Sequence, residues 1–208
     1  MANDRVQLLE QSTRDKEGRL QGRYFSAFEH TEGTYENGQK HGLWKTYHPN
    51  RQTKTEIEYC AGKEHGSRKT YYHTGQLSSE ASYQNGKQHG SCTTYRLDGT
   101  LASELDYKNG KLHGSRKTYF ENGQLEIDEE YQDGQKHGMS RTYRENGSLR
   151  SEGLYQDGRK EGLWVFFHQE GWVAAEKTFH NGREVKEPIQ TDPVIDALTE
   201  RGFTVEPM

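Results

Sequence analysis

The sequence predicts an all-β protein, an elongated single-layer antiparallel sheet of consecutive 24-residue β-hairpins with a short helix covering its carboxy-terminal end. Thirteen aromatic residues stand twelve positions apart, from Tyr35 to Phe179, and glycines recur with a period of 24. No stretch of this region shows the 3.6-residue apolar period of an amphipathic helix. A fixed period of this length is typical of repeat proteins, in which each unit contacts only its neighbours.

The apolar content supports a thin sheet in place of a globular core. Leu, Ile, Val and Phe make up 31 of the 208 residues, which is low enough to raise the question of disorder. The net charge of only −4 and the strict spacing of the tyrosines argue against disorder. We therefore expect one layer of aromatic side chains that pack against neighbouring repeats.

Charge and cysteine usage limit the partners and the compartment. With 28 Lys and Arg against 32 Asp and Glu there is no basic field, so nucleic acid is not expected as a partner. Cys60 and Cys92 are 32 positions apart and are expected to be free thiols in a reducing compartment. Residues 1–14 lack the apolar run of a signal peptide, and no apolar stretch approaches 18 residues. These features predict a cytoplasmic protein without membrane insertion.

Three glycine series define the repeat and the domain boundaries. One runs from Gly42 to Gly162, usually after a histidine, a second from Gly38 to Gly182, and a third from Gly75 to Gly171, with Arg51 at the corresponding place in the first repeat. Gly18 and Gly22 have the same spacing and indicate a shortened first unit near Asp15. The predicted division is an amino-terminal segment (1–17), a repeat array (18–185) and a tail (186–208).

Each repeat reads as a β-hairpin. Segments such as 115–120 and 124–131 alternate in side-chain type, and the loop 121–123 ends in a glycine, as expected for a three-residue hairpin loop. This loop predicts that Tyr119 lies opposite Leu125. In an uninterrupted ladder, Arg116 would then lie opposite Asp128, and Arg68 opposite Glu80. Tyr119, Leu125 and Tyr131 would share one face, and Arg116, Thr118 and Asp128 the other.

The tail carries the signals of a short capping helix. Asp192 suits the N-cap position, Pro193 the first helical turn and Gly202 the position after the last turn. Val194, Ile195 and Leu198 form an apolar stripe between them. We predict a helix over 193–201 that packs on the last hairpin, with Trp172 beneath it.

The repeats resemble a known family. The pattern Y-x-N-G-K-x-H-G, as in Tyr83–Gly90, together with G-x-L-x-x-E-x-x-Y-x-x-G, resembles the MORN-repeat variant of bacterial YwqK-family proteins over roughly residues 18–185. The resemblance implies an antitoxin or immunity protein that binds and neutralises a cognate bacterial toxin domain. MORN repeats also occur in lipid-binding and scaffolding proteins, which is the alternative function. That alternative calls for basic clusters, which the composition does not indicate.

No residue pattern indicates catalysis. Histidines recur from His41 to His137, but hairpins two strands apart are ~9.5 Å apart, too far for two of these histidines to ligate one metal ion. We expect each histidine to satisfy the backbone of its turn. The glycines lack a phosphate-binding pattern, and Cys60 and Cys92 have no recognisable base beside them. We predict a protein that is not an enzyme, with no cofactor, no metal and no small-molecule substrate.

A second periodic series consists of acids 24 positions apart. These carboxylates recur in equivalent positions, without the asymmetry that acid–base catalysis needs, so cross-strand pairing or solvation is the simplest interpretation. The series is Glu56, Glu80, Glu104, Asp128, Glu152 and Glu176.

Partner contacts are predicted where the repeats differ. Two residues after the repeat glycine the chain carries in turn Trp44, Arg68, Cys92, Arg116, Ser140 and Trp164. Trp and Arg are enriched at interface hot spots, although Trp44 and Trp164 could instead shield the ends of the array. We predict a binding surface for a toxin domain made of Trp44, Arg68, Arg116 and Trp164, with Glu56, Glu80, Glu104 and Glu152 meeting basic groups of the toxin.

Overall fold

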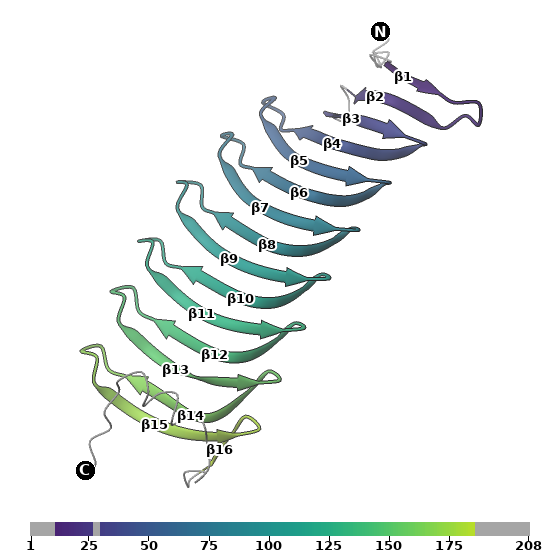
Figure 1. The fold of residues 1–208 in the computed structure, drawn as a ribbon. Coiled ribbons are helices and arrows are strands. Elements are labelled where there is room, and N and C mark those ends of the chain that lie inside the picture. The colour runs from purple at the N-terminus through teal and green to yellow at the C-terminus, as the bar shows by residue number, and fades with distance from the viewer. Residues whose placement is uncertain (1–10, 27–29, 186–208) are drawn as a thin grey trace, which may run out of the picture. The chain divides into compact units, whose positions relative to one another are not determined.

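Consecutive β-hairpins account for all the secondary structure that can be described. The computed structural model describes residues 11–26 and 30–185, and these ranges hold sixteen strands and no helix. The strands follow one another in chain order, each antiparallel to its partner (Figure 1). This confirms the predicted all-β class of consecutive antiparallel hairpins. The predicted helix over 193–201 lies outside the described residues.

The chain forms two compact units, Met1–Lys111 and Leu112–Met208. The strands of the first unit are β1 (Gln11–Arg14), β2 (Leu20–Ser26), β3 (Thr31–Glu36), β4 (Gln39–Tyr47), β5 (Thr53–Cys60), β6 (Lys63–Tyr71), β7 (Leu77–Gln84), β8 (Lys87–Tyr95) and β9 (Leu101–Lys108). The second unit holds β10, which begins at the boundary (Lys111–Tyr119), β11 (Leu125–Gln132), β12 (Gln135–Tyr143), β13 (Leu149–Gln156), β14 (Arg159–Phe167), β15 (Val173–His180) and β16 (Arg183–Val185). Strand pairing begins within the segment 1–17 that the sequence placed before the array. None of the described segments is a helix long and apolar enough to cross a membrane.

Two kinds of turn alternate along each unit. The three-residue loops are as predicted: the Phe120 N–H donates to the Gln124 carbonyl, Gly123 has φ +82°, and Tyr119 pairs with Leu125. The other turns have two residues, as in Asn85-Gly86, where both residues have positive φ. Asn-Gly is favoured there because its left-handed conformation matches the twist of the flanking strands. The twelve-residue aromatic spacing therefore corresponds to one strand and one turn, and successive aromatics lie near opposite edges.

β-Bulges change the predicted faces of the sheet. After each three-residue loop the second strand carries one extra residue, such as Glu126, so that Arg116 pairs with Glu129 and Lys117 with Asp128. Arg68 likewise pairs with Ala81 and not with Glu80. The extra residue reverses the side-chain alternation of that strand. The predicted pairs Arg116–Asp128 and Arg68–Glu80 are therefore wrong, and Tyr131 lies on the face of Arg116, opposite to that of Tyr119.

The glycine that follows the repeated histidine lies in a second β-bulge, in the middle of the strand. Between the pairs Glu129–Ser140 and Tyr131–Lys136, the β12 strand has two more residues than β11, and Gly138 there has φ +90°. Glycine adopts this φ without the steric penalty of a side chain. The Gly42–Gly162 series consequently marks bulges, whereas the other two series mark turns.

Side chains at the edge of the three-residue loops join successive hairpins. His48 Nε2 lies 2.9 Å from the carbonyl oxygen of Tyr71, and the Tyr72 hydroxyl donates to the Tyr95 carbonyl at 2.8 Å. The amide of Asn122 donates in the same way to the Glu145 carbonyl. Carbonyls at the strand ends are thereby satisfied by the preceding repeat, as buried or half-buried backbone groups require.

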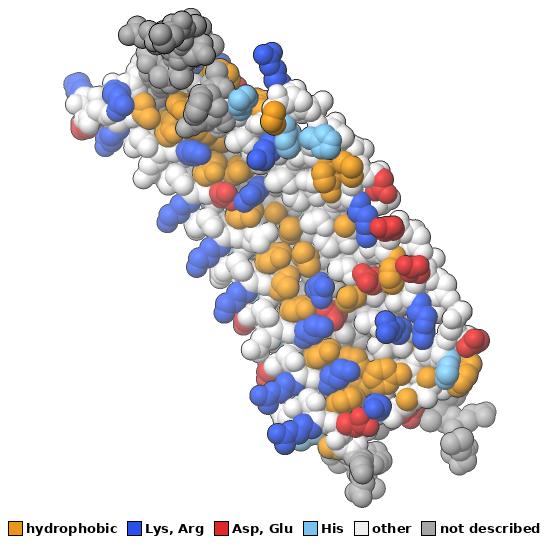
Figure 2. Space-filling model, turned by 180° about the vertical axis from the view of Figure 1, so that it is seen from behind, with side chains coloured by type: hydrophobic (Ala, Val, Ile, Leu, Met, Phe, Trp, Pro, Cys, Tyr) orange, Lys and Arg blue, Asp and Glu red, His pale blue; other side chains and the backbone are white. Residues whose placement is uncertain are grey.

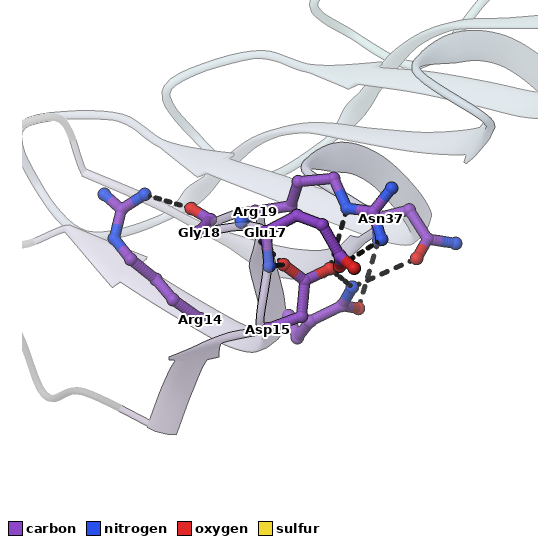
Figure 3. Close-up of polar contacts among 7 residues, drawn as sticks. Arg14, Asp15, Glu17, Gly18, Arg19 and Asn37 are labelled. Atoms are coloured by element: carbon purple, nitrogen blue, oxygen red, sulfur yellow. Dashed lines mark hydrogen bonds and ion pairs between the residues drawn. The ribbon is translucent and has the colours of Figure 1, made fainter.

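The first turn is organised by Asp15 (Figure 3). Its carboxylate accepts hydrogen bonds from the backbone N–H groups of Glu17 and Arg19 and from the Arg19 guanidinium, 2.7 Å away. Gln21 connects this turn to Asn37 in the next one, with bonds of 3.1 and 3.0 Å. Desolvation alone would raise the pKa of Asp15, but the Arg19 and backbone hydrogen bonds outweigh it and lower the pKa from 3.8 to about 2.

The first hairpin is expected to loosen in acid because of Asp15. A carboxyl whose pKa is lowered in the folded state contributes stability above its unfolded pKa of 3.8, and this contribution is lost as the pH falls to about 2. Amide exchange measured by NMR should show faster opening of residues 11–26 across this range. Asp15→Asn should make the opening insensitive to pH there, and an unchanged pH dependence in that variant would refute the assignment.

Candidate functional site

The first unit packs aromatic side chains on the face of the sheet that carries Trp44, here called the tryptophan face. Trp44 is only 3% exposed, and its indole N–H donates to the Thr34 carbonyl at 3.0 Å. Tyr35 meets its ring edge-on at 4.9 Å between centroids, and Lys40 Nζ lies 4.3 Å from the ring centroid. The ring covers Gly33, where a Cβ atom would overlap the indole.

The second unit repeats this arrangement around Trp164, which defines its tryptophan face. Trp164 is 3% exposed and donates to the Leu154 carbonyl at 3.0 Å. Tyr155 packs edge-on at 5.1 Å between centroids, Lys160 Nζ lies 4.0 Å from the ring centroid, and the ring covers Gly153. Both tryptophans are therefore buried residues that pack within their own unit.

Packing explains part of the variation that the sequence led us to assign to partner binding. Each variable residue is matched by a residue of variable size on the preceding strand: glycine beneath Trp44 and Trp164, and Ala81 beside the buried Cys92. The cross-strand neighbour therefore varies from repeat to repeat together with the variable residue. Burial raises the pKa of the Cys92 thiol, and both cysteines are free, as expected.

Arg68 and Arg116, the other two predicted contacts, are half-buried on the tryptophan face. Arg68 lies over the Tyr83 ring, 5.7 Å from its centroid, and 3.5 Å from Glu64. Arg116 lies 2.8 Å from Glu129, a carboxylate that is 3% exposed and also contacts Lys136 and Ser140. This buried cluster was missed in the sequence because the register that forms it depends on the bulge at Glu126.

The acidic series lies on the opposite face, here called the ion-pair face, where carboxylates alternate with cations from strand to strand. In the first unit Lys45 lies 2.8 Å from Glu56, and Lys69 lies 3.4 Å from Glu80. In the second unit Arg141 lies 3.0 Å from the buried Glu152. Glu104 pairs across the ladder with Thr93. Cross-strand ion pairs are thus found for Glu56, Glu80 and Glu152, and the two groups of predicted contact residues lie on different faces.

Tyrosines of the ion-pair face extend this network. The Tyr71 hydroxyl donates to Glu56 at 2.8 Å, and the Tyr47 hydroxyl donates to Glu32. Burial and the neighbouring carboxylate raise the pKa of Tyr71, and likewise that of Tyr47, to about 12. The hydrogen bond with Lys45, followed by that with Tyr71, lowers the pKa of Glu56 despite its partial burial.

A titration of phenolate absorbance is expected to show Tyr47 and Tyr71 ionising near pH 12. Because their folded pKa exceeds the unfolded value of 10.0, they contribute stability below pH 10 that is lost as the pH rises through about 12. Glu56→Gln should lower the pKa of Tyr71, which bonds to Glu56, more than that of Tyr47, which bonds to Glu32 and feels only the charge of Glu56. Equal shifts of both tyrosines in this variant would contradict the pairing.

The histidine series lies near the two-residue turns. His113 Nδ1 accepts a 3.4 Å hydrogen bond from the backbone N–H of Asp133 in the next turn, and Glu161, which replaces the sixth histidine, accepts one from Asn181 at 2.8 Å. Within the described part of the chain, the Nδ1 atom of His89 has no hydrogen-bond partner, and that of His137 lies 3.6 Å from the Asp157 carboxylate, beyond hydrogen-bond distance. The predicted role in satisfying turns therefore holds for His113 and not for every member. The described residues contain no cluster that could hold a metal ion.

The edge of the two-residue turns in the first unit gathers lysines, and is here called the lysine edge: Lys63, Lys87, Lys108 and Lys111. All four are exposed, and Figure 2 shows basic side chains in a row along this border. The Cβ atoms of Lys63 and Lys87 pack against the glycines of the following turns, Gly86 and Gly110. Composition alone did not indicate a basic cluster, but the lysines that follow three successive turn glycines at a spacing of 24, namely Lys63, Lys87 and Lys111, were a usable signal.

These features define a class: a β-hairpin repeat protein with packed aromatics on one face and a neutralised ionic ladder on the other. Six stretches match the model of the MORN repeat variant family: residues 40–61, 64–85, 88–109, 112–133, 136–157 and 160–181. They cover well over half of the chain, which therefore belongs to the MORN repeat variant family. Each match spans a hairpin with a three-residue loop, so the two-residue turns join successive family repeats. No curated protein matches the chain.

Proposed function

We propose that the chain is a non-enzymatic protein-binding module that acts as an immunity protein, binding a cognate toxin domain and occluding its active site or substrate groove. The observation that carries this proposal is the repeated ion-pair face, an extended surface whose equivalent positions offer many similar contacts. Such a surface suits a large protein partner better than a small substrate, because no position differs enough from the others to form a catalytic centre. The sequence resemblance to YwqK-family antitoxins supports the choice of a toxin as the partner.

The burial of the tryptophans refines the proposed contacts. Arg68, Arg116 and the two exposed glutamates among the predicted contacts, Glu80 and Glu104, are the candidates for contact with the toxin. Trp44 and Trp164 would act indirectly, since each supports the hairpins around it. The proposed location is the cytoplasm, where a toxin that has entered the cell would be met.

Co-expression tests the proposal. The toxin domain encoded beside the gene should arrest growth when expressed alone, and co-expression of this chain should restore growth and yield a stoichiometric complex. Alanine at Arg68, Glu80 and Glu104, which spares the buried pair of Arg116 and Glu129, should abolish protection while leaving the protein folded. Full protection by that variant would show that these residues do not contact the toxin. Failure of the native chain to protect the cells or to form a complex would overturn the proposal.

A membrane-associated scaffold is a second candidate, and the lysine edge is the observation that favours it. Cations near a membrane surface attract anionic lipids. This candidate predicts sedimentation of the purified protein with vesicles containing phosphatidylserine, and no such sedimentation with neutral vesicles. Absence of binding at low salt would exclude it.

A further inference from the structure

The charges of the ion-pair face are largely used within the chain. Glu56 is held by Lys45 and by the Tyr71 hydroxyl, each at 2.8 Å, and Glu80 has Lys69 at 3.4 Å. A basic partner would have to break these ion pairs before it could form ion pairs with the same carboxylates. The described part of the first unit thus offers little uncompensated negative charge on this face.

The lysine edge differs because its charges are uncompensated. No ion pair involves Lys63, Lys87, Lys108 or Lys111 among the residues that the structure describes. The stems of Lys63 and Lys87 lie against the next turn glycine, with Cβ atoms 3.9 Å from the position that a glycine Cβ would take. This contact aligns the stems and leaves each ammonium group in solvent. The edge therefore presents a line of available positive charge.

The spacing of these lysines determines the geometry of a ligand that would match them. Lys63, Lys87 and Lys111 occupy equivalent positions two strands apart, which corresponds to ~9.6 Å at ~4.8 Å per strand. A polypeptide in the polyproline II conformation has three residues per turn and rises ~3.1 Å per residue, so that side chains three positions apart point the same way and are separated by ~9.3 Å. Acidic residues at every third position of an extended segment would therefore meet successive lysines.

The residue type favours carboxylates over phosphates. All four positions are lysine, a compact hydrated charge, whereas arginine is preferred where phosphate or nucleic acid is read in a bidentate manner. An acidic protein segment is thus a better match than a nucleic acid.

We propose that the lysine edge is a docking site for an extended acidic segment of the protein partner. This inference rests on the proposed protein-binding function and reverses the charge that the sequence led us to expect for the partner surface. The acidic segment lies along the edge, with one carboxylate at each of Lys63, Lys87 and Lys111, and Lys108 adds to the field at one end.

The test uses the full-length purified chain and labelled synthetic peptides in a fluorescence anisotropy titration. One peptide carries Glu at every third position, and a second has the same composition with all Glu residues in one block. Lys63→Gln/Lys87→Gln is compared with Arg51→Gln/Lys54→Gln, which removes two exposed cations from the opposite edge. We expect the spaced peptide to bind more tightly, and the lysine double variant to bind it roughly threefold to tenfold more weakly, with little change in the control variant.

Several outcomes would overturn the inference. The first is equal affinity for the two peptides, and the second is an equal loss of peptide affinity in the two double variants. The third is lysine-dependent binding that is seen only with phosphatidylserine vesicles or with a single-stranded oligonucleotide at the same salt concentration. The proposed function is judged separately by co-expression. Toxin neutralisation that persists in Lys63→Gln/Lys87→Gln would refute the acidic docking site and leave the immunity function supported. Lysine-dependent peptide binding without any neutralisation would refute the immunity function and leave the docking site supported.

Discussion

Trp164→Ala is expected to lower the free energy of unfolding of the second unit by about 3–5 kcal/mol, the usual cost of truncating a buried aromatic residue. The indole is 3% exposed, packs against Tyr155 and Phe179, and places its N–H on the Leu154 carbonyl. Its loss leaves a void over Gly153 and an unsatisfied carbonyl. Urea denaturation followed by circular dichroism would measure the effect.

Trp172→Ala is the matched control. This tryptophan is 57% exposed and stacks on His168 at the edge of the same unit. Its replacement should change the unfolding free energy by less than about 1 kcal/mol. Similar losses in the two variants would show that Trp164 does not have the packing role assigned to it.

The glycine beneath the ring provides a second route to the same conclusion. Gly153→Ala places a Cβ atom inside the space of the indole and should also destabilise the unit, because overpacking typically costs about 1–3 kcal/mol. The pair Ala81–Cys92 shows that this position of the repeat tolerates alanine when the facing residue is small. In Gly153→Ala/Trp164→Cys the steric cost of the alanine should therefore disappear, which a double-mutant cycle would detect.

How far the sequence predicts this protein depends on which periodicity is considered. The aromatic spacing and the glycine loops predict the antiparallel hairpins, and the loop 121–123 correctly predicts the pair Tyr119–Leu125. The faces were not predictable by alternation, because one extra residue such as Glu126 reverses the orientation of everything that follows in the strand. A bulge of this kind depends on tertiary context and leaves no distinct residue pattern.

The same reversal explains why the candidate contacts were only partly placed. Trp44 and Trp164 were predicted to contact a partner, and the bulges place them on the same face as Tyr59 and Tyr155, against which they pack. The acids of the series fall on the other face, next to Lys45 and its equivalents. Residue type alone therefore identifies the positions that vary among the repeats. The side chains that these residues contact can be predicted only once the register of the strands is known.

The other large effect is expected at Glu129, the buried carboxylate of the second unit. Glu129 is 3% exposed and lies 2.8 Å from Arg116 and next to Lys136. The bond to Glu129 raises the pKa of Lys136 although desolvation opposes it. Glu129→Ala removes the only carboxylate of this cluster and leaves two half-buried cations facing each other. Breaking a buried ion pair in this way typically costs about 3–5 kcal/mol.

The sequence of another repeat supplies apolar replacements that would separate charge compensation from packing. The residues 24 positions earlier than Arg116, Glu129 and Lys136 are Cys92, Leu105 and Leu112. Because apolar replacement of a whole buried ionic cluster is often neutral or stabilising, Arg116→Cys/Glu129→Leu/Lys136→Leu should recover most of the stability lost in Glu129→Ala. Urea denaturation of the native chain and both variants would show it. If the triple variant is as unstable as Glu129→Ala, the carboxylate acts through its shape and hydrogen bonds to Ser140 and Tyr131, and not mainly by neutralising the two cations.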